Sequence, residues 1–426
     1  MDTGTASEER QELSAGVERA PGSASRLWRN RGFNILWAGQ TLSALGDAFA
    51  LVALPLLVLA ATGSVAQMGL VTGVYGVGQL VAGLFAGMLV DRMDRRGVMI
   101  VCDSLRFALY AALPVWWALA GPALWLIYVV SLFGALLGMT FQVAYMTAIA
   151  NLVDRDQLTD ANGRLQATYS VAYVVGPLLA GVITGRAGAP LAIGVDAVTF
   201  AISAASLLLI RLRTQTGDGA KREGKLSELL AGARYLWSQP ALRAITWLTV
   251  ILMLLVGGGI DLFIYHLKHD LRQGDEAVGV VLGLASVGAA LGSTLAPWLR
   301  RRAGFGVIWI GGLALSGLAL ALIGPAPTLW AVAALAMGFT LGDSLRAILQ
   351  ITLRQELTPD HLLGRVTSAF WTLGAVPTSF GAALTAGVAQ RVGTPLTLLG
   401  MGLGVVALAL LAPLTPVRDA RPETSA

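Results

Sequence analysis

Long apolar segments alternate with short polar connections from Phe33 almost to the end of the chain. Each segment has about 20 residues or more, the length that a helix needs to cross a hydrocarbon core about 30 Å thick. We therefore expect each segment to form a transmembrane helix. The twelve predicted spans are residues 34–61, 65–90, 97–119, 123–150, 165–185, 190–210, 242–266, 277–299, 305–324, 328–351, 366–389 and 395–415.

The connections between these segments differ in charge. Those after the first, third and ninth segments carry no Lys or Arg, whereas those after the second, fourth, sixth, eighth and tenth carry several Arg residues. Because basic loops are retained in the cytoplasm, the pattern predicts that the even-numbered connections and both termini are cytoplasmic. Arg186, Arg391 and the mixed segment 268–272 are the exceptions. We expect an integral protein of the bacterial inner (plasma) membrane.

The two halves of the chain repeat each other. Gly69–Ile100 aligns with Gly279–Ile310 without a gap, and Gly163-Arg164 aligns with Gly364-Arg365. Parallel repeats of this kind are typical of secondary transporters, with the substrate path between the halves. The predicted divisions are a disordered cytoplasmic tail (1–32), a six-helix bundle (33–211), a cytoplasmic linker with an amphipathic helix (212–241), a second six-helix bundle (242–415) and a cytoplasmic C-terminal tail (416–426).

The composition excludes most other classes of protein. Only 13% of residues are charged and 55% are hydrophobic, whereas soluble domains have about 25% charged residues. The net charge of +5 comes from basic residues in the connections, so topology explains it and nucleic acid is not an expected partner. The sequence contains no phosphate-binding loop, no metal-ligand spacing among its three His residues and no recognisable catalytic arrangement. We expect no cofactor, no metal and no enzymatic activity, and a monomer in a lipid bilayer.

A charged turn connects the second and third segments. It reads Gly87-Met-Leu-Val-Asp91-Arg92-Met-Asp94-Arg95-Arg96-Gly97 and resembles the signature loop of the major facilitator superfamily, although Asp94 stands where that pattern usually has Gly. With the opening Phe33-Asn-Ile-Leu-Trp37-Ala-Gly39-Gln40, it is similar to the branch of enterobactin exporters and macrolide or multidrug efflux proteins. The resemblance implies an all-α membrane protein with twelve helices in two parallel six-helix repeats.

The resemblance also implies a gate. Asp91 would lie near the cytoplasmic start of helix 11, and ion pairs there would hold the two halves together and break when the protein opens. The alternative is a solvated turn that only fixes topology. The predicted gating residues are Gly87, Asp91, Arg92, Asp94, Arg95, Arg96 and Arg365. Gly176, Pro177 and Gly181 partly match a motif linked to exporters, with Ala172 where that motif usually has Gly.

Asp47 is the most informative ionisable residue. It lies about 20 Å along the first segment at 1.5 Å per residue, and a carboxylate near the middle of a bilayer is a functional candidate by default. Gln40, Ser43 and Asp47 share one helix face, which we expect to line a central cavity. Asp47 is therefore a candidate for proton coupling or cation binding, with a structural hydrogen bond as the alternative.

Acid–Arg pairs occur inside two further segments. Asp103 and Arg106, and likewise Asp343 and Arg346, are three residues apart and can pair within one helix. Both pairs are proton-coupling candidates, with structural ion pairs as the alternative. Asp261 and His266 are expected near the outer rim, and Asp196 is expected to be structural.

The remaining cavity candidates are mostly aromatic, and such walls suit bulky amphipathic or cationic substrates. They are Gln142, Tyr145, Tyr169, Tyr173, Trp247, Phe370 and Trp371. The leading hypothesis is a proton-driven exporter of small amphipathic compounds that works by alternating access. The alternatives are uptake or facilitated transport of a small metabolite, and a membrane sensor or scaffold that transports nothing.

Overall fold

The computed structural model describes Leu27 and residues 30–153, 157–210 and 225–417. The predicted disordered tails and the first part of the predicted linker lie outside these residues. Within the described ranges the chain forms helices and no strand. Some side chains inside the helices are also outside the description, and four of them were predicted to be functional: Gly87, Asp91, Arg92 and Trp371.

The first half contains six long helices, each close to a predicted span. They are α3 (Arg31–Thr62), α4 (Val65–Arg92), α5 (Arg95–Ala120), α6 (Leu124–Leu152), α7 (Leu158–Ala187) and α8 (Ala189–Leu208). Short polar residues begin several of them. Ser64 caps α4 by accepting a hydrogen bond from the backbone NH of Gln67 at 3.4 Å, and Asp94 caps α5 through the NH of Gly97 at 3.0 Å. Such caps satisfy NH groups that have no partner within the helix.

The second half repeats this plan. Its elements are α10 (Pro240–Val256), α11 (Gly259–Tyr265), the π-helical turn η2 (His266–Asp270), α12 (Asp275–Ala303), α13 (Phe305–Ile323), α14 (Leu329–Leu357), α15 (Asp360–Val392), α16 (Thr394–Leu411) and the 3₁₀ turn η3 (Ala412–Leu414). The predicted seventh span corresponds to α10, α11 and η2 together, because the chain breaks at Gly257-Gly258.

Eleven helical segments in the described ranges are long and apolar enough to cross a membrane. The predicted fifth span is the remaining one. It lies in α7, which contains the apolar stretch Val171–Ala187. The prediction of an all-α membrane protein with twelve helices in two parallel repeats is confirmed as a fold class.

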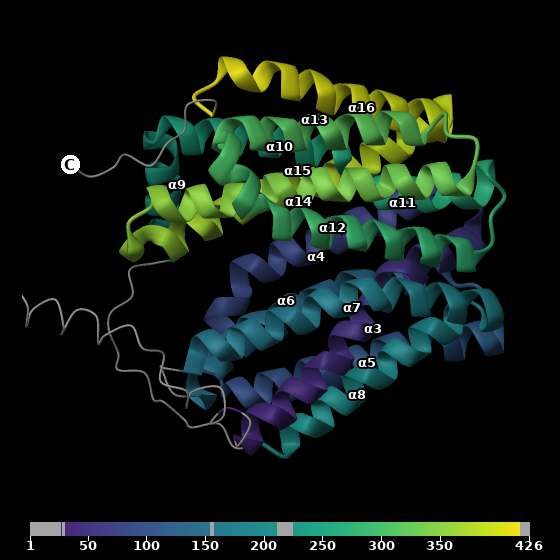
Figure 1. Cartoon of the computed structure of the whole chain (residues 1–426). Coiled ribbons are helices and arrows are strands. Elements are labelled where there is room, and N and C mark those ends of the chain that lie inside the picture. The colour runs from purple at the N-terminus through teal and green to yellow at the C-terminus, as the bar shows by residue number, and fades with distance from the viewer. Residues whose placement is uncertain (1–26, 28–29, 154–156, 211–224, 418–426) are drawn as a thin grey trace, which may run out of the picture.

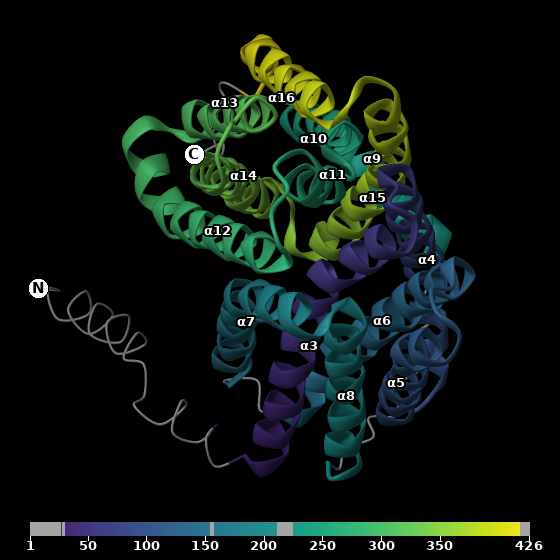
Figure 2. The ribbon, with the colours of Figure 1, turned by 90° about the vertical axis from the view of Figure 1, so that its right-hand side faces the viewer.

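The twelve helices form two bundles that lie side by side (Figure 2). In the first bundle α3 packs on α7 and α8, and α6 packs on α4 and α5. In the second, α14 packs on α12 and α13, and α16 packs on α13. In the chain segment that links the two bundles, Lys225–Ser238 forms the helix α9, which packs against α15. Its Tyr235 hydroxyl donates to the carbonyl of Leu357 at 2.7 Å.

Two pairs of helices join the bundles: α4 with α15, and α7 with α12. Small residues allow the close approach. A Cβ added to Gly69 on α4 would overlap Ala386 on α15, and one added to Gly279 on α12 would overlap Gly181 on α7. Gly69 and Gly279 are equivalent in the sequence repeat, and each faces the other bundle. The bundles lie together at the end opposite α9 and diverge toward α9 (Figure 1).

Candidate functional site

A cavity of about 640 Å³ lies mainly within the first bundle. It is lined by α3, α4, α5, α6 and α7, and α11 is the one contribution from the second bundle. Apolar side chains alternate with polar and aromatic ones around it. Its polar and aromatic lining residues are Gln40, Ser43, Asp47, Thr72, Tyr75, Gln79, Arg106, Tyr110, Phe141, Gln142, Tyr169, Tyr173 and Asp261.

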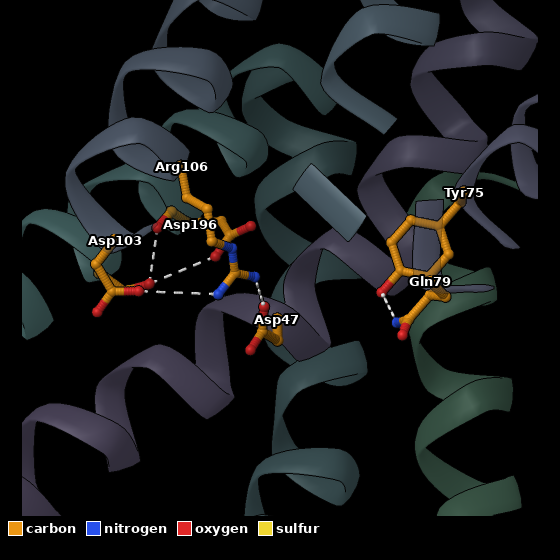
Figure 3. Close-up of polar contacts among 7 residues, drawn as sticks. Asp47, Tyr75, Gln79, Asp103, Arg106 and Asp196 are labelled. Atoms are coloured by element: carbon orange, nitrogen blue, oxygen red, sulfur yellow. Dashed lines mark hydrogen bonds and ion pairs between the residues drawn. The ribbon is translucent and has the colours of Figure 1, made fainter. Parts of the chain in front are cut away.

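Asp47 and Arg106 form an ion pair in this cavity. The Nη2 atom of Arg106, on α5, donates to Oδ1 of Asp47, on α3, at 2.5 Å (Figure 3). The Arg106 side chain is only 9% exposed, whereas that of Asp47 is 44% exposed. The carboxylate is thus the accessible member of the pair. Spacing along one helix predicted a partner for Arg106 within α5, but the nearer carboxylate belongs to another helix.

Two further acids and an aromatic ring surround Arg106. Its Nη1 atom lies 4.0 Å from Oδ1 of Asp103, which is fully buried one turn earlier in α5. The guanidinium also lies 3.8 Å from the centre of the Phe200 ring, a cation–π contact. Asp196, the residue predicted to be structural, is fully buried on α8 in the same group (Figure 3). Because a buried cation is tolerated only with counter-charges, these acids account for the placement of Arg106.

Five of the predicted cavity residues line the cavity: Gln40, Ser43, Gln142, Tyr169 and Tyr173. Gln40 also donates to the Ser203 hydroxyl at 2.9 Å. This hydrogen bond ties α3 to α8 next to the cavity.

The other cavity predictions fall elsewhere. Tyr145 is buried and stacks on Phe141, itself a lining residue, with 6.0 Å between ring centres. Trp247 does not line this cavity, because it points outward from α10 and packs edge-on against Trp237 of α9. Phe370 is likewise absent from the lining: it is buried on α15 under the guanidinium of Arg354, 4.5 Å away.

Sequence reasoning did not select the lining residues of α4. Thr72, Tyr75 and Gln79 all face the cavity, and the Gln79 amide donates to the Tyr75 hydroxyl at 3.0 Å (Figure 3). Their positions i, i+3 and i+7 define one helix face. This is the same pattern that singled out Gln40, Ser43 and Asp47, so the signal was present in the second segment too.

Asp261, predicted near the outer rim, lies at the boundary between the bundles. It is fully buried on α11, lines the cavity, and accepts a hydrogen bond of 2.5 Å from the Thr72 hydroxyl across the boundary between the bundles. His266, the other predicted rim residue, is also buried, and its Nδ1 atom lies 2.8 Å from the carboxylate of Asp270.

The second bundle has an ion pair of its own. Arg346 on α14 donates to Asp343 at 2.7 Å and to Gln350 at 2.9 Å. Gln350 also accepts a hydrogen bond of 3.1 Å from Thr249 on α10. The predicted pairing within one helix is therefore present. This pair does not line the cavity described above.

The turn predicted to be a gate has mixed contacts. Asp94 is the cap of α5, and Arg96 donates to the carbonyls of Leu207 and Leu208 at the end of α8, both at 2.8 Å. Carbonyls at a helix C-terminus have no partner within the helix, so Arg96 ties the start of α5 to the end of α8. Arg95 is half-buried, and the backbone of Arg365 lies against Gly232 of α9.

The exporter-type motif lies where α7 meets its neighbours. A Cβ on Gly176 would overlap Ala48 of α3, and Gly181 lies against Gly279 of α12. Pro177 is inside the helix, and its carbonyl faces Gly279. The motif thus fixes close packing, one contact within the first bundle and one between the bundles. Among the residues that the structure describes, no group of three or more His, Cys, Asp or Glu could hold a metal ion.

Comparison with known proteins agrees with this architecture. The sequence profile of the Major Facilitator Superfamily matches residues 36–382. The chain is 28% identical over 403 residues to the multidrug efflux pump Tap of Mycolicibacterium fortuitum, covering 90% of this chain and 95% of Tap. It is 26% identical over 404 residues to the enterobactin exporter EntS of Citrobacter koseri, covering 93% and 95%.

Solved structures share the fold. The nucleoside transporter NupG matches with a TM-score of 0.71 at 13% identity, covering 90% of this chain and 98% of that one. A bacterial homologue of the iron transporter ferroportin, in an inward-facing state, matches with a TM-score of 0.68 at 18% identity, covering 91% and 98%. With its apolar helices, paired bundles and efflux relatives, the chain is a membrane transporter and not an enzyme, and it belongs to the Major Facilitator Superfamily.

Proposed function

We propose that this protein exports small amphipathic compounds in exchange for protons. Export is supported by two relatives that match over nearly the whole chain, a multidrug efflux pump and an enterobactin exporter. An amphipathic substrate is supported by the cavity wall, in which Tyr75, Tyr169 and Tyr173 stand among aliphatic side chains. Walls of this composition bind bulky compounds through apolar contact and a few polar groups.

The observation that carries proton coupling is the ion pair between Asp47 and Arg106. Its carboxylate is accessible from the cavity, while its guanidinium is almost fully buried. A proton arriving from the cavity can therefore reach Asp47 and neutralise it. Ionisable groups inside transmembrane helices commonly act as proton relays.

Loss of the charge on Asp47 has a defined consequence. Arg106 keeps its charge and loses its nearest counter-ion, while Asp103 remains 4.0 Å away on the same helix. We propose that Arg106 then moves toward Asp103 and releases α3 from α5 at this point. Protonated Asp47 would thus favour one arrangement of the first bundle, and ionised Asp47 would favour the other. Coupling requires such a difference.

The two arrangements would correspond to alternating access. We propose that both termini and α9 face the cytoplasm, which puts the contacts between Gly69 and Ala386 and between Gly181 and Gly279 toward the outside. The bundles are then closed on the outer side. The turn from Gly87 to Gly97 and the start of α15 would form the inner gate. The protein is proposed to work as a monomer, with one bundle rocking against the other.

The test is transport of ethidium into inverted membrane vesicles under an imposed pH gradient. Wild-type protein should accumulate the dye only with the gradient, and Asp47→Asn should accumulate no more than vesicles without the protein. Glu356→Gln is the matched control, since it removes an ion pair with Arg300 outside the cavity, and it should transport normally. Accumulation by wild-type protein that ignores the gradient would exclude proton antiport.

A further inference from the structure

The break between α10 and α11 places a second-bundle carboxylate in the first-bundle cavity. Gly258 has φ of +75°, a left-handed conformation that favours glycine. Gly257 lies against the backbone of Thr378 and Ala382 on α15, and its carbonyl accepts a hydrogen bond of 2.8 Å from Thr385. Contacts with α15 thus stabilise the break. The break sets the direction of α11 and, with it, the position of Asp261.

The Asp261 carboxylate is only partly satisfied. The residue is 1% exposed, and one oxygen, Oδ2, accepts the 2.5 Å hydrogen bond from Thr72. The other oxygen, Oδ1, is buried and has no hydrogen-bond partner among the described residues. Leaving a buried acceptor without a partner costs free energy, more when the group is charged. Its position in the cavity lining makes a ligand the available partner.

The charges of the cavity lining do not balance without such a ligand. Arg106 is the one basic residue among the lining residues, and its guanidinium is bound to Asp47 at 2.5 Å. Among the described residues, no Lys or His contributes to the lining. When ionised, Asp261 therefore contributes a negative charge for which the described wall of the cavity provides no cation.

The rest of the lining suits a cation with an apolar body. Tyr75 and Tyr173 present accessible rings, 39% and 51% exposed, to a cavity that also includes Leu51 and Leu54. Aromatic faces attract organic cations, and the attraction grows when water is excluded. An inorganic cation has no apolar body to contact the leucine side chains.

We propose that Asp261 is the recognition site for a monovalent organic cation, the protonated or quaternary amine of an amphipathic compound. Asp47, which Arg106 neutralises, is then left for the proton. Substrate and proton would use different carboxylates, one from each half of the chain. Binding of the cation at Asp261 does not depend on the proposed function. The further statement that this cation is the exported compound rests on the proposed function.

The experiment is equilibrium binding of two ions of the same shape and opposite charge. Tetraphenylphosphonium and tetraphenylborate are dialysed against the purified full-length protein in detergent at neutral pH. Wild-type protein should prefer the cation. Asp261→Asn, which keeps the shape and can still bond to Thr72, should weaken binding of the cation by about tenfold or more and leave binding of the anion unchanged or stronger.

Glu356→Gln is the matched control, because it removes the carboxylate of an ion pair outside the cavity. It should retain the preference for the cation. Unchanged binding of the cation by Asp261→Asn, or equal loss in both variants, would overturn the proposal. Neither result would test pH-driven transport, which the vesicle assay measures separately. Failure of the vesicle assay would likewise not contradict a measured preference for the cation.

Discussion

At the scale of single residues, the two bundles contain similar ion pairs in different surroundings. Arg106 and Arg346 are each 9% exposed, and each binds an Asp that is 44% exposed. Arg346 has one acid and the amide of Gln350 as partners. Arg106 has Asp47 and, in addition, the fully buried Asp103 and Asp196 around it. Removing the positive charge should therefore have unequal effects.

We expect Arg106→Met to lower the stability of the protein in detergent by about 3–5 kcal/mol, the usual cost of leaving buried charge without its partner. Arg346→Met should cost clearly less, because it leaves only the partly exposed Asp343 without its partner and no fully buried acid. The measurement is the midpoint of thermal unfolding for both variants. Equal losses of stability in the two variants would show that Arg106 does not stabilise the buried Asp103 and Asp196.

At the scale of elements, the irregular positions determine the site. In a straight helix over 242–266, Asp261 and His266 would lie about 140° apart around the helix axis. The observed break at Gly257-Gly258 starts a new helix, α11, and buries both residues. The break depends on one backbone conformation, so it can be tested by adding a single methyl group.

Gly258→Ala should destabilise the protein by about 1–2 kcal/mol from the left-handed conformation alone, and the new Cβ would also meet Ala382 on α15. Gly259→Ala is the control, since Gly259 has no positive φ and its new Cβ would lie at an ordinary contact distance of 3.4 Å from the Val256 side chain. Thermal unfolding of both variants measures the difference. If the two lose the same stability, the left-handed turn is not what positions α11.

At the scale of the whole molecule, the contacts that join the bundles concentrate at the end opposite α9. Glycines on α7 and α12 meet there, and Arg186 on α7 lies 3.6 Å from Glu276 on α12. Both of these charged side chains are more than half exposed, so their ion pair contributes little. Close packing of small residues joins the bundles, and such packing can be separated when the transporter changes state.

A cross-link between Arg186→Cys and Glu276→Cys, made with a short bifunctional thiol reagent, should therefore stop transport. The single native cysteine, Cys102, is buried and would first be replaced by Ser. Reducible reagent should give inhibition that a reductant reverses, measured as ethidium accumulation in vesicles. Either single-cysteine variant treated in the same way is the control. Full transport by the cross-linked protein would mean that these ends of α7 and α12 need not separate.

The sequence by itself determined the elements and their repetition. Apolar segments long enough to cross a bilayer have few other stable structures, because backbone groups in hydrocarbon must bond internally. It also singled out Asp47, Arg106, Gln40 and Ser43, since polar residues at helical spacing stand out in an apolar segment.

Only the tertiary structure decided which of these groups meet. Local spacing assigned Arg106 to Asp103, but the fold brings Asp47 closer from another helix. A charged turn that resembles a gate uses Arg96 to hold the carbonyls of α8. Asp261 entered the cavity because a glycine pair interrupts its helix. Contacts between helices depend on crossing points and local breaks, and hydrophobic periodicity along one helix carries no information about either.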